Sequence, residues 1–331
     1  MKRNLSSLTI DSCLLLLFAA VVCLVSLNPN NSVFQIPDSF YQMNTIFLSI
    51  LIEALPFVLI GVLIAGFIQM FITENQLKRW IPKNKYAAIL MSCVVGALFP
   101  ACECGIVPIV RRLIAKGVPL FAGGIGFLLT GPLINPIVIF STYMAFGNDL
   151  EIALLRMGIG FIVALIIAFI ISLLYRTNQL KQEAVHTTTQ INYETSLLTK
   201  ARKTLLHAVD EFFDMGKYLI IGAFLAAFVQ VYVSTKLLVS IGDGPFTSLF
   251  VMMGLAYFLS LCSEADAFIG SSFSNIFPKG AILGFLVYGP MIDLKNTFMM
   301  LSVFKARFVF AFVMIVTVIV FISISCWQLL F

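Results

Sequence analysis

Long apolar runs separated by short polar connections occupy almost the whole of this 331-residue chain. A helix that crosses a bilayer needs about 20 consecutive apolar residues, so the length allows roughly eight to ten spans with their loops. The strands of a transmembrane β-barrel would alternate apolar and polar residues, and these runs do not alternate. The pattern therefore predicts an all-α integral membrane protein.

Two of the apolar runs contain helix-breaking residues near their middle. Pro100, Gly105 and Pro108 break the run near 87–110. The resulting pieces of about a dozen residues are too short to cross a ~30 Å hydrocarbon core. The run near 247–277 occupies the corresponding place later in the chain. We interpret both runs as re-entrant broken-helix hairpins, which leaves about seven full spans.

The distribution of basic residues supports the hairpins. If both hairpins return to their own side, sixteen basic residues lie inside and three outside, at Arg156, Lys236 and Lys279. Lys217 and Lys295 then lie within spans. If every run crossed the membrane, ten would lie inside and nine outside. Because Lys and Arg concentrate in cytoplasmic loops, the hairpin arrangement is favoured, with the N-terminus in the cytoplasm.

The chain also contains an internal repeat. Three pairs of motifs recur in the same order, and their separation drifts only from 161 to 158 residues. Under the hairpin topology the two copies run in opposite directions through the membrane, which predicts an inverted-topology repeat. The matched motifs are Glu53 with Asp214, Cys102-Glu103-Cys104 with Cys262-Ser263-Glu264, and 130–135 with 288–293.

These features divide the chain into two related halves with connecting segments. The N-terminal segment resembles a signal peptide in outline, but no small-residue cleavage site follows 13–27. We interpret it as a retained helix, with cleavage as the alternative. The predicted segments are an N-terminal transmembrane helix and external loop (1–43), repeat half 1 (44–146), a linking transmembrane helix (147–175), a cytoplasmic loop (176–206), repeat half 2 (207–303) and a C-terminal transmembrane helix (304–331).

Composition narrows the class of function. Charged residues make up 11% of the chain and apolar residues 60%, which excludes a soluble fold. The net charge of +5 comes mainly from loop residues that set the topology, so it does not indicate nucleic-acid binding. The sequence has no phosphate-binding loop, nucleotide fingerprint or Ser-His-Asp arrangement. We therefore expect neither an enzyme nor an ATP-driven pump.

Thiols and carboxylates gather at the two hairpin breaks. Thiolates bind soft or borderline metals and trivalent arsenic, and a carboxylate adds a harder oxygen ligand. An acid within a membrane is costly, which makes it a functional candidate. The alternative for the cysteines is a packing role, as small apolar residues that let helices approach closely. The candidate substrate ligands are Cys102, Glu103 and Cys104, which could together hold a metal ion, and Cys262, Glu264 and Asp266.

Two other groups of polar residues are candidates. Asn135, Asp293 and Lys295 each follow a Gly-Pro pair, where a helix break would direct helix ends at the same cavity. We assign them to substrate binding, with a buried structural pair between Asp293 and Lys295 as the alternative. Glu53 and Asp214 lie early in their helices and are candidates for proton coupling, or for pairing with a nearby base.

Four motifs resemble those of a predicted permease family of bacterial membrane proteins that includes the organoarsenical efflux permeases. The similarity covers about 44–303 and rests on Pro100-x-Cys102-x-Cys104-Gly105-x-x-Pro108, Lys116-Gly117-Val118-Pro119, 130–136 and Gly289-Pro290-x-Ile292-Asp293-x-Lys295. The resemblance implies a multi-pass permease of the bacterial plasma membrane, and in the arsenical branch export through thiols such as Cys102 and Cys104. It also implies that some members work with a partner protein. Glu103 departs from the small neutral residue expected there, and carboxylates suit a cation.

Broken helices meet near the bilayer midplane in transporters and form the substrate site. We therefore predict a secondary permease that moves a thiophilic metal or metalloid species, with no resident cofactor. Its expected partners are the lipid bilayer, the small inorganic or organometalloid substrate and a possible protein subunit. Two alternatives are a membrane redox or sensor protein in which Cys102 and Cys104 cycle between dithiol and disulfide, and a structural subunit of a permease complex.

Overall fold

The computed structural model describes the chain over 38–71, 76, 79, 81–82, 84–99, 102–175, 179–181, 197–232 and 244–330. The predicted N-terminal helix lies outside these residues, as does most of the predicted cytoplasmic loop. Within the described residues every named element is a helix. One isolated antiparallel bridge, between Leu180 and Phe304, ties the start of the loop to the end of the second half.

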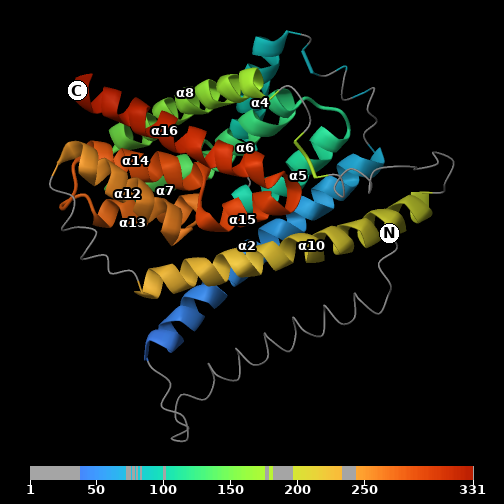
Figure 1. Cartoon of the computed structure of the whole chain (residues 1–331), viewed down its shortest axis with the longest axis horizontal. Helices are drawn as coiled ribbons and strands as arrows, with labels where there is room; N and C mark the ends of the chain where they lie inside the picture. The colour runs from blue at the N-terminus through green and yellow to red at the C-terminus, as the bar shows by residue number, and fades with distance from the viewer. Residues whose placement is uncertain are drawn as a thin grey trace, which may run out of the picture.

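The four longest helices extend through the body of the molecule, and shorter helices lie between them (Figure 1). Among the described residues, these four are long and apolar enough to cross a membrane, and no span count beyond four is established. The apolar segments 120–145 and 279–303 are each divided into shorter helices. The four long helices are α2 (Asp38–Phe71), α8 (Leu150–Leu174), α10 (Leu197–Tyr232) and α16 (Ala306–Leu330).

Shorter helices fill the intervals between the long ones, in a similar order in each half. In each half, the long helix is followed by two helices separated by a break. Next comes an apolar segment that is itself split into shorter helices, and then the next long helix. The first interval contains α4 (Lys85–Leu98), α5 (Glu103–Ala115), the π-helix η1 (Leu120–Ile125), α6 (Gly126–Thr130) and α7 (Pro136–Ala145). The second contains α12 (Pro245–Leu259), α13 (Ser263–Ser272), α14 (Lys279–Met291) and α15 (Leu294–Val303).

The helix breaks occur at residues with extended or left-handed backbones. Gly105 and Pro108 were predicted to break the first run, but both lie inside α5, so that prediction is correct only for the segment around Pro100. Helix α4 ends as Phe99 turns extended (φ −93°, ψ 112°), and extended Cys102 precedes α5. In the second half Ser260 adopts a left-handed conformation (φ 48°), which ends α12 before extended Cys262 starts α13. A left-handed backbone is unfavourable for a non-glycine residue, so this break is held by its surroundings. Both predicted hairpins therefore contain a real interruption of the helix.

Close glycine contacts bring the long helices against the broken ones. Helices α2 and α10 cross on one side of the body (Figure 1). Gly61 of α2 lies against the backbone of Gly105 in α5, and a Cβ at Gly61 would collide with it. Gly222 of α10 approaches Lys295 similarly, since its Cβ would lie 3.0 Å from the Lys295 Cα. Small residues of this kind allow close helix contact within a membrane.

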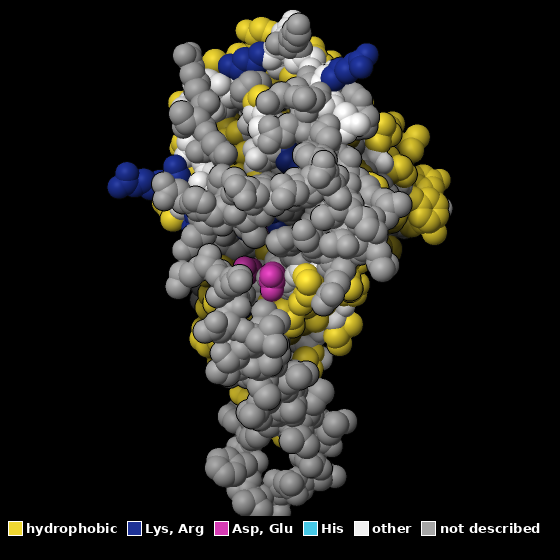
Figure 2. All heavy atoms as spheres, turned by 90° about the vertical axis from the view of Figure 1, so that its right-hand side faces the viewer, with side chains coloured by type: hydrophobic (Ala, Val, Ile, Leu, Met, Phe, Trp, Pro, Cys, Tyr) yellow, Lys and Arg dark blue, Asp and Glu magenta, His cyan; other side chains and the backbone are white. Residues whose placement is uncertain are grey.

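Apolar side chains cover much of the outer surface, as expected for lipid contact. Leu98, Phe310 and Leu330 are each more than 70% exposed. Figure 2 shows the face at the right of Figure 1, where Lys and Arg side chains project from the upper part and acidic side chains lie lower, beside hydrophobic ones. One basic residue is buried. Arg156, counted among the three basic residues on the outer side, lies within α8 and is only 1% exposed.

Candidate substrate site

Four short helices begin at residues that the internal repeat had matched. Cys102 is the N-cap of α5 and Cys262 is the N-cap of α13. Asn135 is the N-cap of α7, where its side chain accepts a hydrogen bond from the Val138 amide, and Asp293 caps α15 through the Asn296 amide. The first turn of a helix leaves amide groups unpaired and carries partial positive charge. The four starts therefore place polar groups and positive helix ends inside the protein.

A buried ion pair joins the two halves at one of these starts. The Nζ atom of Lys295, on α15, lies 3.2 Å from Oε1 of Glu103, on α5, and 3.6 Å from Oδ2 of Asp293. All three residues are at most 4% exposed. Lys295 also donates to the Ser260 carbonyl at the break after α12. Asp293 and Lys295, which were assigned to substrate binding, thus do form the buried pair that was the alternative interpretation.

The two thiols of the first hairpin face this cluster. Cys104 is 1% exposed, while Cys102 at the break is partly exposed. The two sulfur atoms interact with each other, and both lie within electrostatic range of Lys295. Paired thiols of this kind are the side chains that bind soft ions and trivalent metalloids. Cys102, Cys104, Glu103, Asp293 and Lys295 are therefore gathered in one place.

A second buried cluster surrounds Arg156, a residue that the sequence did not indicate for the site. Its guanidinium donates to the Thr142 hydroxyl of α7 (2.7 Å) and to the Ser263 carbonyl at the start of α13 (3.1 Å). Among the acids, Asp266 and then Glu264 exert the largest electrostatic attraction on its positive charge. Asp266 is 1% exposed, whereas Glu264 is partly exposed. A buried arginine could have been suspected from its position seven residues into an apolar run.

Several buried polar atoms near these clusters make no hydrogen bond among the described residues. They are Oε2 of Glu103, Oδ2 of Asp266, Oδ2 of Asp293, Nε of Arg156 and both amide atoms of Asn296. Most buried polar side-chain atoms in proteins have at least one partner. This concentration of unpaired atoms in residues of 1% exposure is typical of a functional site rather than of a packed core.

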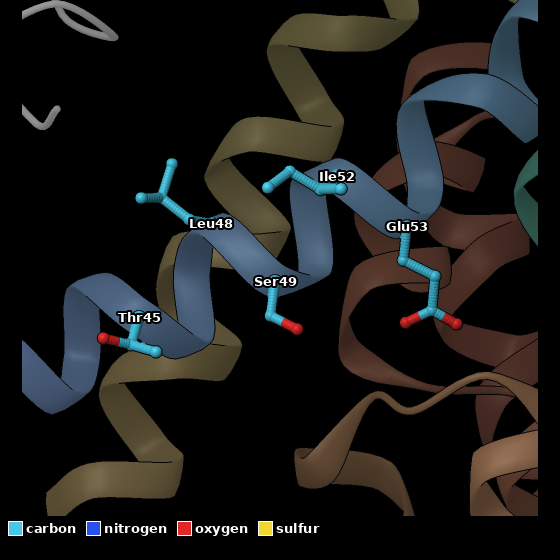
Figure 3. A pocket seen from close by; sticks show the side chains of 5 residues that line it. All are labelled: Thr45, Leu48, Ser49, Ile52 and Glu53. Atoms are coloured by element: carbon cyan, nitrogen blue, oxygen red, sulfur yellow. The ribbon is translucent and has the colours of Figure 1, made fainter.

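Cys262 and Glu53 lie apart from the thiols of the first hairpin. The Cys262 sulfur interacts with the Glu53 carboxyl group of α2. Glu53 is exposed and lines an open groove of about 510 Å³ with Thr45, Leu48, Ser49 and Ile52. Figure 3 shows that Ser49 and Glu53, one turn apart, point to the same side of α2. No hydrogen bond or ion pair among the described residues joins Cys262 to Cys102 or Cys104.

The matched acids Glu53 and Asp214 have different surroundings. Asp214 is exposed on α10, near Arg111 of α5. The neighbouring Glu211, which sequence reasoning missed, is 3% exposed and binds both Arg111 (3.1 Å) and Arg112 (2.9 Å). Through these contacts Arg111 and Arg112 tie the end of α5 to α10.

No group of three or more His, Cys, Asp or Glu side chains in the described part of the chain is arranged to hold a metal ion. Glu103, a proposed metal ligand, is paired with Lys295. Asn135 uses its side chain to cap α7 and donates weakly to the Gly131 carbonyl (3.4 Å). Glu103, Asp293 and Lys295 are therefore joined by direct ion pairs, whereas no hydrogen bond or ion pair in the described part of the chain joins Cys262, Glu264 or Asn135 to them.

Comparison with known proteins gives consistent results over most of the chain. A family model described as "Predicted permease" matches residues 39–325. UPF0718 protein YcgR of Bacillus subtilis is 54% identical over 285 residues, covering 86% of this chain and 96% of YcgR. A Streptococcus mutans protein named putative two-component membrane permease complex subunit is 45% identical over 279 residues, which cover 84% of this chain and 92% of that protein. UPF0718 protein MJ0584 of Methanocaldococcus jannaschii is 27% identical over 147 residues, 43% and 38% of the two chains. No solved structure matches.

Proposed function

This chain belongs to the predicted permease family, and we propose that it is a secondary permease whose substrate is a thiophilic metalloid or metal species. The observation that carries the proposal is the buried cluster at the break of the first hairpin. Two thiols, a carboxylate and an ammonium group meet there, at a discontinuity of the helix and next to an element of the other half. Irregular backbone at membrane depth is tolerated where it lines a cavity or is buried in protein.

The charges around the thiols favour one kind of substrate. Glu103 and Asp293 both pair with Lys295, so a metal cation bound to either carboxylate would lie next to the lysine ammonium group, which repels it. A trivalent metalloid such as an organoarsenical forms covalent bonds to thiolates and needs no carboxylate. We therefore favour a trivalent metalloid species held by Cys102 and Cys104, with a thiophilic divalent metal as the second possibility.

The arrangement of the halves suggests how such a substrate would cross. Each half has a broken hairpin followed by a divided segment, and Lys295 of one half contacts Glu103 of the other. In an inverted repeat, rocking of one half against the other opens the central site to each side in turn. We propose this mechanism, with the N-terminus in the cytoplasm and the protein in the plasma membrane.

The function could also require a partner subunit. The Streptococcus mutans relative is named as a subunit of a two-component permease complex, and it matches 84% of this chain. We propose that this chain also works with a second membrane component. A structural subunit without transport of its own is the competing interpretation, and transport by the purified chain in vesicles would separate the two.

The thiol assignment can be tested in proteoliposomes with phenylarsine oxide as the probe. The variant with Cys102→Ser and Cys104→Ser should lose uptake, because serine hydroxyls do not form stable bonds to trivalent arsenic. The Cys326→Ser variant is the matched control, since this exposed cysteine lies on α16 away from the cluster. Equal uptake by the double variant and the wild type would refute the assignment. A disulfide that forms and breaks between Cys102 and Cys104 without uptake would favour the redox alternative.

A further inference from the structure

Asp266 is an acid that the surrounding protein leaves without a partner. It is 1% exposed, on α13, and its Oδ2 atom makes no hydrogen bond among the described residues. No ion pair of Asp266 is found in the described part of the chain either. An ionised carboxylate in such surroundings is strongly unfavourable, and a buried group without compensation takes a proton instead. In the arrangement seen here, Asp266 is therefore best accommodated as a neutral carboxyl group.

A counter-ion for the charged form lies close by. Arg156 donates to the Ser263 carbonyl, and Ser263 is three residues before Asp266 on the same helix. Residues three apart lie on one helix face and are separated by about 4.5 Å along the axis. The Nε atom of Arg156 also lacks a hydrogen-bond partner among the described residues. Arg156 therefore contacts the face of α13 that also carries Asp266, and it is the strongest favourable charge acting on the Asp266 carboxylate.

The packing around Asp266 preserves space for its carboxyl group. A Cβ atom at Gly289, on α14, would lie 2.8 Å from Oδ2 of Asp266. Any larger residue would therefore press on the carboxyl group. Gly289 belongs to the Gly-Pro motif near the end of α14, just before the break that leads to Asp293. The chain therefore passes from the Gly289 contact with Asp266 to Lys295 within six residues (295 − 289).

We propose that Asp266 is the proton-binding residue that couples transport to a proton gradient, and that Arg156 is its counter-ion when the proton is released. The carboxylate takes one proton from water on one side of the membrane, becomes neutral and releases the proton on the other side. No electron is transferred. This inference rests on the proposed permease function. It assigns proton binding, which would drive transport, to a residue other than the thiols that would bind the substrate.

The other charged groups around Asp266 set its electrostatic surroundings. Glu103 of α5 and Asp293 of α15 disfavour its negative charge, while Lys295 and Arg156 favour it. Glu264 is the nearest acid on its own helix. Helices α7 and α14 pack directly against α13. Their titratable side chains are Tyr143, Tyr288, whose hydroxyl bonds to Thr317, and Lys279, which pairs with Glu151.

Infrared difference spectroscopy on the full chain in lipid vesicles tests the proton site without any substrate. The wild type should show the carbonyl band of a buried protonated carboxyl group that disappears as the pH rises. Asp266→Asn should abolish this band, and Glu264→Gln, the matched control on the same helix, should retain it. A band that persists unchanged in Asp266→Asn would overturn the inference. If this variant does not fold, Asp266→Glu decides, because a shifted band supports the inference and an unshifted band overturns it.

Transport in the same vesicles separates this inference from the proposed function. Under a pH gradient the wild type should concentrate phenylarsine oxide, whereas Asp266→Asn should exchange it across the membrane without concentrating it. Equal concentration by both proteins would overturn the coupling role. If the band belongs to Asp266 but the wild type moves no phenylarsine oxide, the proton site stands and the proposed substrate is wrong.

Discussion

Lys295 of α15 lies 3.2 Å from Glu103 of α5, and this ion pair connects residues 192 positions apart in two different halves of the chain (295 − 103). Both side chains are almost completely buried, at 5% and 2% exposure. Taking two charges out of water is costly, and their attraction compensates only where the geometry is good. Such a pair is a weak source of stability, but breaking it leaves a buried charge uncompensated.

Replacing Lys295 with Met should therefore destabilise the protein by about 3–5 kcal/mol, since both Glu103 and Asp293 lose their partner. Chemical unfolding in detergent measures this loss. The matched control is Lys279→Met, which breaks the exposed pair with Glu151 and should cost about 0–1 kcal/mol. Adding Glu103→Gln to Lys295→Met should recover part of the loss, and a double variant no more stable than Lys295→Met would contradict this account.

Asp293 has two separable roles, and conservative substitution distinguishes them. Asp293→Asn keeps a side-chain oxygen to cap α15 but removes the charge that faces Lys295. Asp293→Ala removes both. We expect the alanine variant to be less stable than the asparagine variant by about 1 kcal/mol, the usual value of an N-cap. Thermal unfolding followed by circular dichroism gives the comparison, and equal stability of the two variants would exclude the capping role.

The contact of Gly61 with Gly105 predicts a steric effect. A Cβ at Gly61 would collide with the Gly105 backbone, so Gly61→Ala should push α2 away from α5 and cost about 1–3 kcal/mol. Gly158→Ala is the control, because a Cβ there meets nothing within 4 Å. The yield of monodisperse protein and the unfolding midpoint report the effect. If both alanine variants behave like the wild type, α2 and α5 are not in close contact in the folded protein.

Glu211 predicts a further loss of stability. Its carboxylate accepts hydrogen bonds from Arg111 and Arg112, and the Arg112 side chain is 1% exposed. Glu211→Gln should cost about 3–5 kcal/mol, because it removes the negative charge that compensates two largely buried guanidinium groups. Asp210→Asn, at the adjacent exposed position, should change stability little. Limited proteolysis of the detergent-solubilised protein should also proceed faster in Glu211→Gln, and unchanged proteolysis and unfolding would argue against a tie between α5 and α10.

Local sequence features predicted the helix breaks well. Pro100 indicated the interruption between α4 and α5, and the motif around Asp293 indicated the one between α14 and α15, whereas Gly105 did not break its helix. These features act through the backbone of a few neighbouring residues, by removing a donor or by capping the next helix, so they can be recognised without knowledge of the fold. The number of full spans was harder to predict, because an apolar run does not reveal whether its helix continues across the membrane.

The candidate site was predicted only in part. Cys102, Glu103 and Cys104 were identified because acids and thiols are rare inside apolar runs. Arg156 and Glu211 were missed, since Arg156 was counted only as a basic residue outside the membrane and Glu211 belongs to no recognised motif. Cys262 was expected to join the thiols of the first hairpin, but the structure pairs it with Glu53. Which partner a buried group finds depends on helix packing, and sequence spacing alone does not encode that packing.

The sequence by itself determined the membrane class, the helical content, the helix breaks and the family, because hydrophobicity and local backbone chemistry act over short stretches of chain. Only the tertiary structure decided how the scarce charges are distributed. It gave Glu103 and Asp293 a shared lysine, buried Arg156 beside α13 and left Asp266 without a partner. The physical reason is that a charge in an apolar interior is stable only with a specific neighbour, and that neighbour comes from a distant part of the chain.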